Sequence, residues 1–227
     1  MAIDYKYAYL VGDLLLALIW SILFLIRKDL RKEILSLSIL GGIAGIATEV
    51  FYLQDYWQPQ LFNSWVIGFE DFLFGFFACG ISATIYEEIF GKRFAKKKKF
   101  RTLWVLKPVP LLVLVVIVMS ISVFGLGLSS MYTSFILFLV AFIIMIFLRR
   151  DLFINGFLSG IFMGILMVVC YLSLLAIFPD LINKFWFVEN LSGIELWSIP
   201  LEELIWAFCL GMAVGPYWEF IKGYKLR

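Results

Sequence analysis

Seven apolar runs, each long enough to cross a lipid bilayer, dominate this sequence of 227 residues. A spanning helix needs about twenty apolar residues because the hydrocarbon core of a bilayer is about 30 Å thick. The chain is also 63% hydrophobic, which is more than the core of a soluble domain of this size can bury. We therefore expect an all-α polytopic membrane protein with seven transmembrane helices. The runs fall at 7–26, 34–53, 66–86, 109–127, 131–148, 154–178 and 199–218.

The basic residues predict how these helices are oriented. Of the 19 Lys and Arg residues, 17 lie in segments that the seven spans would place on one side of the membrane, and only Lys6 and Lys184 fall on the other side. Lys and Arg are retained on the cytoplasmic side of a membrane. We expect a plasma membrane protein with its amino terminus outside and its carboxyl terminus in the cytoplasm.

Three pairs of similar segments indicate an internal repeat. "FLIRKDL" at 24–30 resembles "FLRRDL" at 147–152, with Asp29 and Asp151 122 positions apart. The other two pairs are 132 positions apart: "IGFEDFLFGFF" at 67–77 with "IPLEELIWAFC" at 199–209, and "YEEIFGK" at 86–92 with "WEFIKGY" at 218–224. This spacing predicts a 3+1+3 layout of two parallel three-helix repeats, 1–95 and 129–227, joined by a basic loop and linker helix at 96–128. Parallel repeats place a functional cavity at their interface.

The sequence contains few of the features that metal or cofactor sites require. It has no histidine, and its three cysteines lie inside predicted spans without CxxC spacing, so no metal site is predicted. No glycine-rich phosphate loop is evident, and assistance by a reduced flavin or a nicotinamide is left open. The net charge of +2 carries no information about nucleic acid, and we expect no nucleic-acid partner, while a homo-oligomer is possible. A retinal protein needs a buried lysine. Every lysine of this sequence lies in a tail or a loop, which excludes that class.

Paired carboxylates at equivalent places in the two repeats are the candidate catalytic residues. Glu70 with Asp71, and Glu202 with Glu203, stand at the outer entrances of the third and seventh spans. Neighbouring helical residues point about 100° apart, so one acid of each pair can face the bundle. An alternative explanation is structural, because acids in a first turn favour the helix dipole. Glu49 is a further intramembrane acid. Placing an acid inside a membrane costs free energy, so such a residue is by default a candidate functional residue.

Aromatic side chains surround these acids and suggest what the site binds. We predict a substrate-binding set of Asp13, Trp65, Phe72, Trp197 and Trp206. A neutral carboxylic acid can donate a proton, an ionised neighbour can remove one, and aromatic faces stabilise a cation between them. These are the requirements for cyclising an alkene by protonation. Carboxylates without basic partners can also bind a transported cation or proton, and this alternative stays open.

The motif "PLEE" at 200–203, the related "FED" at 69–71 and the seven spans resemble the membrane-embedded lycopene cyclases of the heterodimeric or fused type. The resemblance implies two related three-helix units, and Gly68 stands where the first unit would carry proline. It further implies an intramolecular lyase or isomerase that cyclises the apolar isoprenoid lycopene in the lipid bilayer without net redox change. Glu202, Glu203, Glu70 and Asp71 would then be the acid and base candidates. The competing hypothesis is a 3+1+3 small-molecule or cation-coupled transporter.

Overall fold

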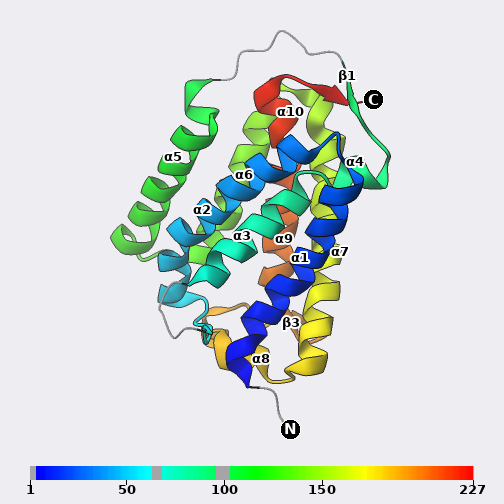
Figure 1. The fold of residues 1–227 in the computed structure, drawn as a ribbon. Helices are drawn as coiled ribbons and strands as arrows, with labels where there is room; N and C mark the ends of the chain where they lie inside the picture. Colours follow the sequence, from blue (N-terminus) through cyan, green and yellow to red (C-terminus); the bar gives the residue numbers. More distant parts are fainter. Residues whose placement is uncertain (1–3, 63–67, 96–102, 227) are drawn as a thin grey trace.

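The computed structural model describes residues 4–62, 68–95 and 103–226. These residues form a bundle of long helices with short elements at its ends (Figure 1). The α-helices are α1 (Ala8–Ile26), α2 (Arg31–Asp55), α3 (Phe69–Ser82), α4 (Ile85–Ile89), α5 (Pro108–Ser120), α6 (Ser130–Leu148), α7 (Phe153–Ile177), α8 (Leu181–Phe185), α9 (Leu201–Val214) and α10 (Tyr217–Lys222). The strands are β1 (Phe94–Ala95), β2 (Glu195–Leu196), β3 (Ile199–Pro200) and β4 (Lys225–Leu226). Strand β1 pairs antiparallel with β4, and β2 pairs antiparallel with β3.

Six helical segments of the described chain are long and apolar enough to cross a membrane. They are Tyr5–Ile26, Arg31–Asp55, Pro108–Gly125, Ser130–Leu148, Arg150–Ile177 and Leu201–Lys222. The predicted span 66–86 corresponds instead to α3, which has 14 residues and is followed after a short turn by α4. The protein is therefore mostly helical with six candidate spans, and the count of seven stays a prediction.

The helices of the two halves have equal lengths and the same order. Helices α1 and α6 have 19 residues each, α2 and α7 have 25, and α3 and α9 have 14. The first two pairs begin 122 positions apart and the third pair 132 positions apart, which are the spacings of the similar sequence segments. Helix α5 lies between the halves in the chain and at the edge of the bundle in space (Figure 1).

The two ends of the bundle carry different elements. The amino-terminal end holds the start of α1, the short helix α8, the strand β3 and the first turns of α3 and α9 (Figure 1). The carboxyl-terminal end holds α4, α10 and the strand β1. Helix α9 runs through the middle of the bundle, and its segment is the most buried of the six candidate spans, whereas that of α5 is the least buried.

Glycines allow two helix pairs to approach closely. On α2 and α3, a Cβ added at Gly75 would lie 2.3 Å from the carbonyl oxygen of Gly41. On α7 and α9, a Cβ added at Gly211 would lie 2.6 Å from the carbonyl oxygen of Ser159. Small residues at such crossings let helix backbones pack against each other in membranes. These contacts bring the first turns of α3 and α9 to defined positions against α2 and α7.

We expect Gly75→Ala to lower the free energy of unfolding by about 1–3 kcal/mol, because the helix backbones must move apart to accept the methyl group. Gly164→Ala is the matched control, since its Cβ would meet no atom closer than 4.0 Å and alanine favours a helix. Thermal unfolding of both variants in detergent measures the difference. Equal stability of Gly75→Ala and the parent protein would contradict this packing.

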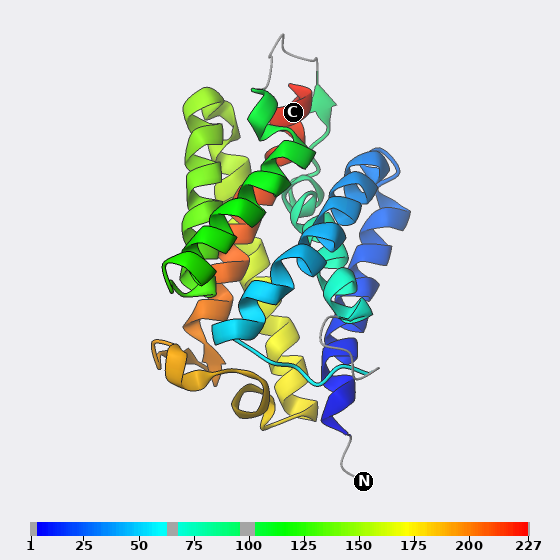
Figure 2. The ribbon, with the colours of Figure 1, turned by 90° about the vertical axis from the view of Figure 1, so that its left-hand side faces the viewer.

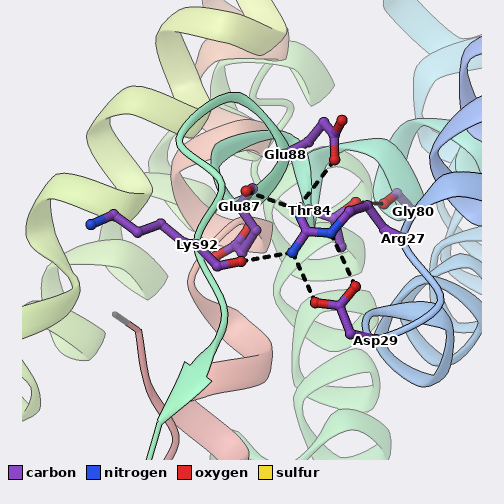
Figure 3. Close-up of polar contacts among 7 residues, drawn as sticks. All are labelled: Arg27, Asp29, Gly80, Thr84, Glu87, Glu88 and Lys92. Carbon is purple, nitrogen blue, oxygen red and sulfur yellow. Dashed lines mark hydrogen bonds and ion pairs between the residues drawn. The ribbon is translucent and has the colours of Figure 1, made fainter.

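An arginine cluster ties the first two helices to α4 at the carboxyl-terminal end (Figure 3). Arg27 donates to both carboxylate oxygens of Asp29, at 3.0 and 2.9 Å, and forms an ion pair with Glu88 at 3.2 Å. It also donates to the carbonyl oxygens of Glu87 and Lys92, at 2.8 and 2.7 Å. The hydrogen bonds from Arg27 lower the pKa of the Asp29 carboxyl. This ion pair therefore stabilises the fold above the ordinary pKa of aspartate and is lost as the pH falls through the lowered value.

A second arginine cluster occupies the corresponding place in the other half. Arg149 donates to both carboxylate oxygens of Asp151, at 2.9 and 2.8 Å. It also donates to the carbonyl oxygens of Glu219 and Tyr224, at 3.2 and 2.7 Å. Each of these four residues lies 122 or 132 positions after its counterpart in the Arg27 cluster. The similar sequence segments therefore form similar contacts in the two halves.

Candidate functional site

A cavity of about 510 Å³ runs inside the bundle. Its volume lies within the usual range of ligand pockets, and most of its lining is apolar. Four carboxylates line it, one each from α1, α2, α3 and α9: Asp13, Glu49, Asp71 and Glu203. All four are at least 94% buried. The cavity therefore combines an apolar interior with carboxylic acids, which is the combination that the sequence led us to expect.

The structure separates the two acids of each pair. Asp71 and Glu203 line the cavity, whereas Glu70 and Glu202 are not among the lining residues. Consecutive positions on a helix point about 100° apart, so only one acid of each pair faces inward. Asp71 and Glu203 occupy equivalent positions, 132 residues apart, at the third position of α3 and of α9.

The outward acids bind loop backbone. Glu70 Oε1 accepts a hydrogen bond from the Phe62 N–H at 2.9 Å. Glu202 Oε1 accepts hydrogen bonds from the Ser192 N–H at 2.7 Å and from the Tyr132 hydroxyl at 3.1 Å. In both halves the outward acid thus holds the loop that precedes its helix. This is a structural role, although it differs from the interaction with the helix dipole that the sequence left open as an alternative.

The inward acid of the second half is held by aromatic donors. Glu203 Oε1 accepts a hydrogen bond from the Trp186 Nε1–H at 2.7 Å and another from the Tyr56 hydroxyl. Tyr171 lies beside the same carboxylate. Hydrogen bonds from several donors stabilise a carboxylate in its ionised form. These donors hold the Glu203 carboxylate in a fixed position at the amino-terminal end of the cavity.

The acids of the first half have fewer partners. Asp71 Oδ2 accepts the Gly68 N–H at 2.6 Å, which caps α3, while its Oδ1 accepts no hydrogen bond from the described residues. Among the residues that the structure describes, neither oxygen of Asp13 has a hydrogen-bond partner, and neither does Glu49 Oε1. A buried carboxyl group without donors or a cation is stable only as the neutral acid. Asp13, which has no donor for either oxygen among the described residues, is therefore suited to carry a proton into the cavity.

A row of aromatic rings connects the two groups of acids. The ring centroids of Tyr9 and Trp57 are 4.9 Å apart, those of Trp57 and Trp186 are 5.4 Å apart, and those of Trp186 and Tyr171 are 6.0 Å apart. Trp57 and Trp186 also pair through a backbone bridge. All four side chains line the cavity. Aromatic faces stabilise a nearby positive charge, so this row can stabilise a carbocation between donor and acceptor.

The predicted substrate-binding residues lie in different places. Asp13 and Trp206 line the cavity, and the Trp206 ring packs 5.6 Å from Phe74, its counterpart 132 positions earlier. Phe72 and Trp197 are not among the lining residues. Phe72 packs 5.8 Å from Phe76, and Trp197 is 64% exposed in the turn between β2 and β3. Trp65 falls outside the described residues.

The predicted substrate-binding set did not include the aromatic partners of Glu203. Tyr56 and Trp186 hold Glu203 from outside the predicted spans, and their sequence positions give no sign of this contact. Tyr171 had a usable signal, because it stands 122 positions after Glu49 and so replaces an acid of the first half. The described residues contain no group of three or more Cys, Asp and Glu side chains arranged to hold a metal ion.

A second set of buried acids lies at the carboxyl-terminal end of the bundle and was also missed. Glu33, Glu87 and Glu219 are each at most 1% exposed. The Asn155 amide donates to Glu87 Oε1 at 3.0 Å, and Asn155 stands 122 positions after Glu33. This set joins α2, α4, α7 and α10 across the two halves, and it does not line the cavity.

Comparison with known proteins adds one finding about the second half of the chain. Residues 129–221 match the family model described as lycopene cyclase. The matched segment contains α6, α7 and α9, and with them Glu202 and Glu203. No curated protein and no solved structure matches the chain. The match agrees with the resemblance carried by the motif "PLEE" and supports a carotenoid cyclase function in general terms.

Proposed function

We propose that this chain, whose residues 129–221 match the family model of lycopene cyclases, cyclises the end of a linear carotenoid such as lycopene inside the membrane. The observation that carries the proposal is the cavity, in which a row of aromatic rings connects acids that have unpartnered oxygens with a hydrogen-bonded carboxylate. The apolar lining fits a hydrocarbon substrate. The enzyme would be an isomerase of carotenoid biosynthesis.

In the proposed reaction the acids of the first half supply the proton. Asp13, Glu49 or Asp71 protonates the terminal double bond of the polyene, because a neutral carboxylic acid in an apolar site is a proton donor. The neighbouring double bond then attacks the resulting cation and closes the ring. One carbon–carbon bond forms in this step, and the positive charge moves into the ring.

The second half completes the reaction. Glu203 removes a proton from the ring carbon next to the cation, which forms the ring double bond. One proton is gained and one is lost, so substrate and product are isomers and the balance requires no oxidant or reductant. Trp57 and Trp186 face the path between donor and acceptor and stabilise the cation.

The proposal also covers the number of membrane spans, the internal repeat and the orientation of the bundle. We place α3 and α4 together as the seventh span, and we read the chain as two parallel repeats, 1–95 and 129–227, joined by 96–128. The equal helix lengths and the matching Arg27 and Arg149 clusters support this duplication. The amino-terminal end, with the acids of the cavity, then faces outward, and the carboxyl-terminal end faces the cytoplasm.

Expression in a bacterium that accumulates lycopene tests the proposed function. We expect monocyclic or bicyclic carotene in the extracted pigments, compared with cells that carry an empty vector. Unchanged lycopene beside folded protein in the membrane would contradict the proposal. It would favour the transporter hypothesis, for which uptake into vesicles is the appropriate assay.

We expect Tyr56→Phe to slow cyclisation about tenfold, because it removes one hydrogen bond to the Glu203 carboxylate and keeps the ring. Tyr132→Phe is the matched control, since this tyrosine donates to Glu202, which faces away from the cavity. Initial rates of carotene formation in membranes measure both effects. A similar loss in the two variants would contradict the role of Tyr56 in positioning Glu203.

A further inference from the structure

The cavity extends far beyond the acids. Along α2 its lining runs from Glu49 to Leu37, which is about 18 Å at 1.5 Å per residue. At the carboxyl-terminal end it reaches Tyr217 and Phe220. The Tyr217 hydroxyl donates to the carbonyl oxygen of Leu106 at 2.9 Å, and this bond ties α10 to the segment before α5. The four lining carboxylates all lie near the other end, so most of the length is apolar.

The exposed members of the lining show where the cavity meets the surface. Three lining side chains are exposed, namely Leu114 on α5 (41%) and Val140 and Ile144 on α6 (46% and 36%). Every other lining residue is buried or partly buried. Figure 2 shows α5 in front of the bundle, with α6 on one side and α2 on the other. The cavity therefore opens between α5 and α6.

This opening faces hydrocarbon and has no polar side chain at its mouth. The lining residues of α5 are all apolar, and those of α6 include one hydroxyl, Ser134, which donates to the Met131 carbonyl oxygen at 2.7 Å. Both helices are candidate membrane spans. A solute from water would have to cross lipid to reach this mouth, whereas a membrane-dissolved hydrocarbon meets it directly.

We propose that the α5–α6 opening, formed by Leu114, Val140 and Ile144, is a binding site for the unreacted tail of a linear isoprenoid hydrocarbon. This inference rests on the proposed function and adds the substrate's path and orientation. One end of the polyene lies at the acids, and the chain follows the apolar cavity and leaves through the opening into lipid. Because the acids stand at one end only, each binding event presents one end of the substrate. A two-ended product then requires release, reversal and rebinding.

Bulky substitutions at the opening test the proposal. Ala141 follows Val140 on α6 and also lines the cavity. We expect Leu114→Trp/Ala141→Trp to lower the rate of lycopene cyclisation about a hundredfold, because a blocked tail displaces the reacting end from the acids. The control is Ile117→Trp/Ile136→Trp, which places the same bulk on exposed residues of α5 and α6 that do not line the cavity. We expect the control to keep the parent rate at equal protein level. If the two variants cyclise lycopene at the same rate, whether both keep the parent rate or both lose activity, the proposal is overturned.

Photolabelling of the unmodified protein gives a readout that does not depend on turnover. The probe is a linear isoprenoid hydrocarbon with a diazirine at one end, added to membranes and mapped by mass spectrometry. We expect labels on the lining residues of α5 and α6 that excess lycopene removes and added phospholipid does not. Labels that respond only to phospholipid, or that fall elsewhere, would overturn the site. Labelling as expected without any cyclised product would keep the site and reject the proposed function.

Discussion

We expect Glu203→Gln to lower the rate of cyclisation by a factor between about a hundred and ten thousand relative to the parent protein. The amide still accepts hydrogen bonds from Trp186 and Tyr56 through its oxygen, so the local structure is kept. It is not basic enough to remove a proton from a cationic ring. The rate of carotene formation in membranes that contain equal amounts of protein measures the effect.

Glu202→Gln is the matched control for this variant. Glu202 is the adjacent residue on α9, yet it is not among the residues that line the cavity, and it binds the Ser192 N–H and the Tyr132 hydroxyl. We expect this variant to keep its activity and to lose some stability. The same ranking is expected in the first half, with Asp71→Asn more harmful than Glu70→Gln. Full activity of Glu203→Gln, or equal loss in Glu202→Gln, would contradict the division of the pairs.

The largest expected effect on stability is that of Arg149→Ala, which we expect to lower the free energy of unfolding by about 3–5 kcal/mol. The Arg149 side chain is 4% exposed, and its loss leaves Asp151 and the carbonyl oxygens of Glu219 and Tyr224 without this donor. The Asp151 side chain is 27% exposed, so the cost comes mainly from the two carbonyl oxygens that lose a charged donor and from the space that the buried Arg149 side chain leaves. Unfolding in mixed detergent, followed by circular dichroism, measures the change.

The neighbouring residue provides the control for this prediction. Arg150 has the same charge and is exposed, so Arg150→Ala should change the stability little. Arg27→Ala should destabilise the protein in the same manner as Arg149→Ala, since Arg27 forms the corresponding contacts in the first half (Figure 3). Arg149→Ala with the stability of Arg150→Ala would contradict the role of this cluster.

The apolar runs predicted most helix positions closely. The runs at 7–26, 131–148 and 154–178 correspond to α1, α6 and α7 within a residue or two at each end. The run at 66–86 did not form one long helix, because α3 ends at Ser82 and the chain turns before α4. Hydropathy did not reveal this break, because residues 66–86 form one largely apolar run. The equivalent break after α9 has a visible signal in Gly215 and Pro216.

The candidate site could be predicted only in part. The duplicated pairs pointed to α3 and α9, but the sequence did not show that Asp71 and Glu203 face inward, because either neighbour of a pair can do so. The partners of Glu203 come from segments 17 and 147 positions away in the chain, a distance over which periodicity carries no information. The buried acids Glu33, Glu87 and Glu219 were missed because each stands near a loop, where an acid is ordinarily solvated.

Cyclisation in heavy water tests whether a proton from a carboxyl group initiates ring closure without redox change. The purified protein is placed in lipid vesicles that contain lycopene, prepared in D₂O without flavin or nicotinamide, and the products are analysed by chromatography and mass spectrometry. We expect cyclic carotene that carries one deuterium for each ring formed, because the carboxyl proton exchanges with solvent before it is transferred. A cyclic product without deuterium would contradict this mechanism.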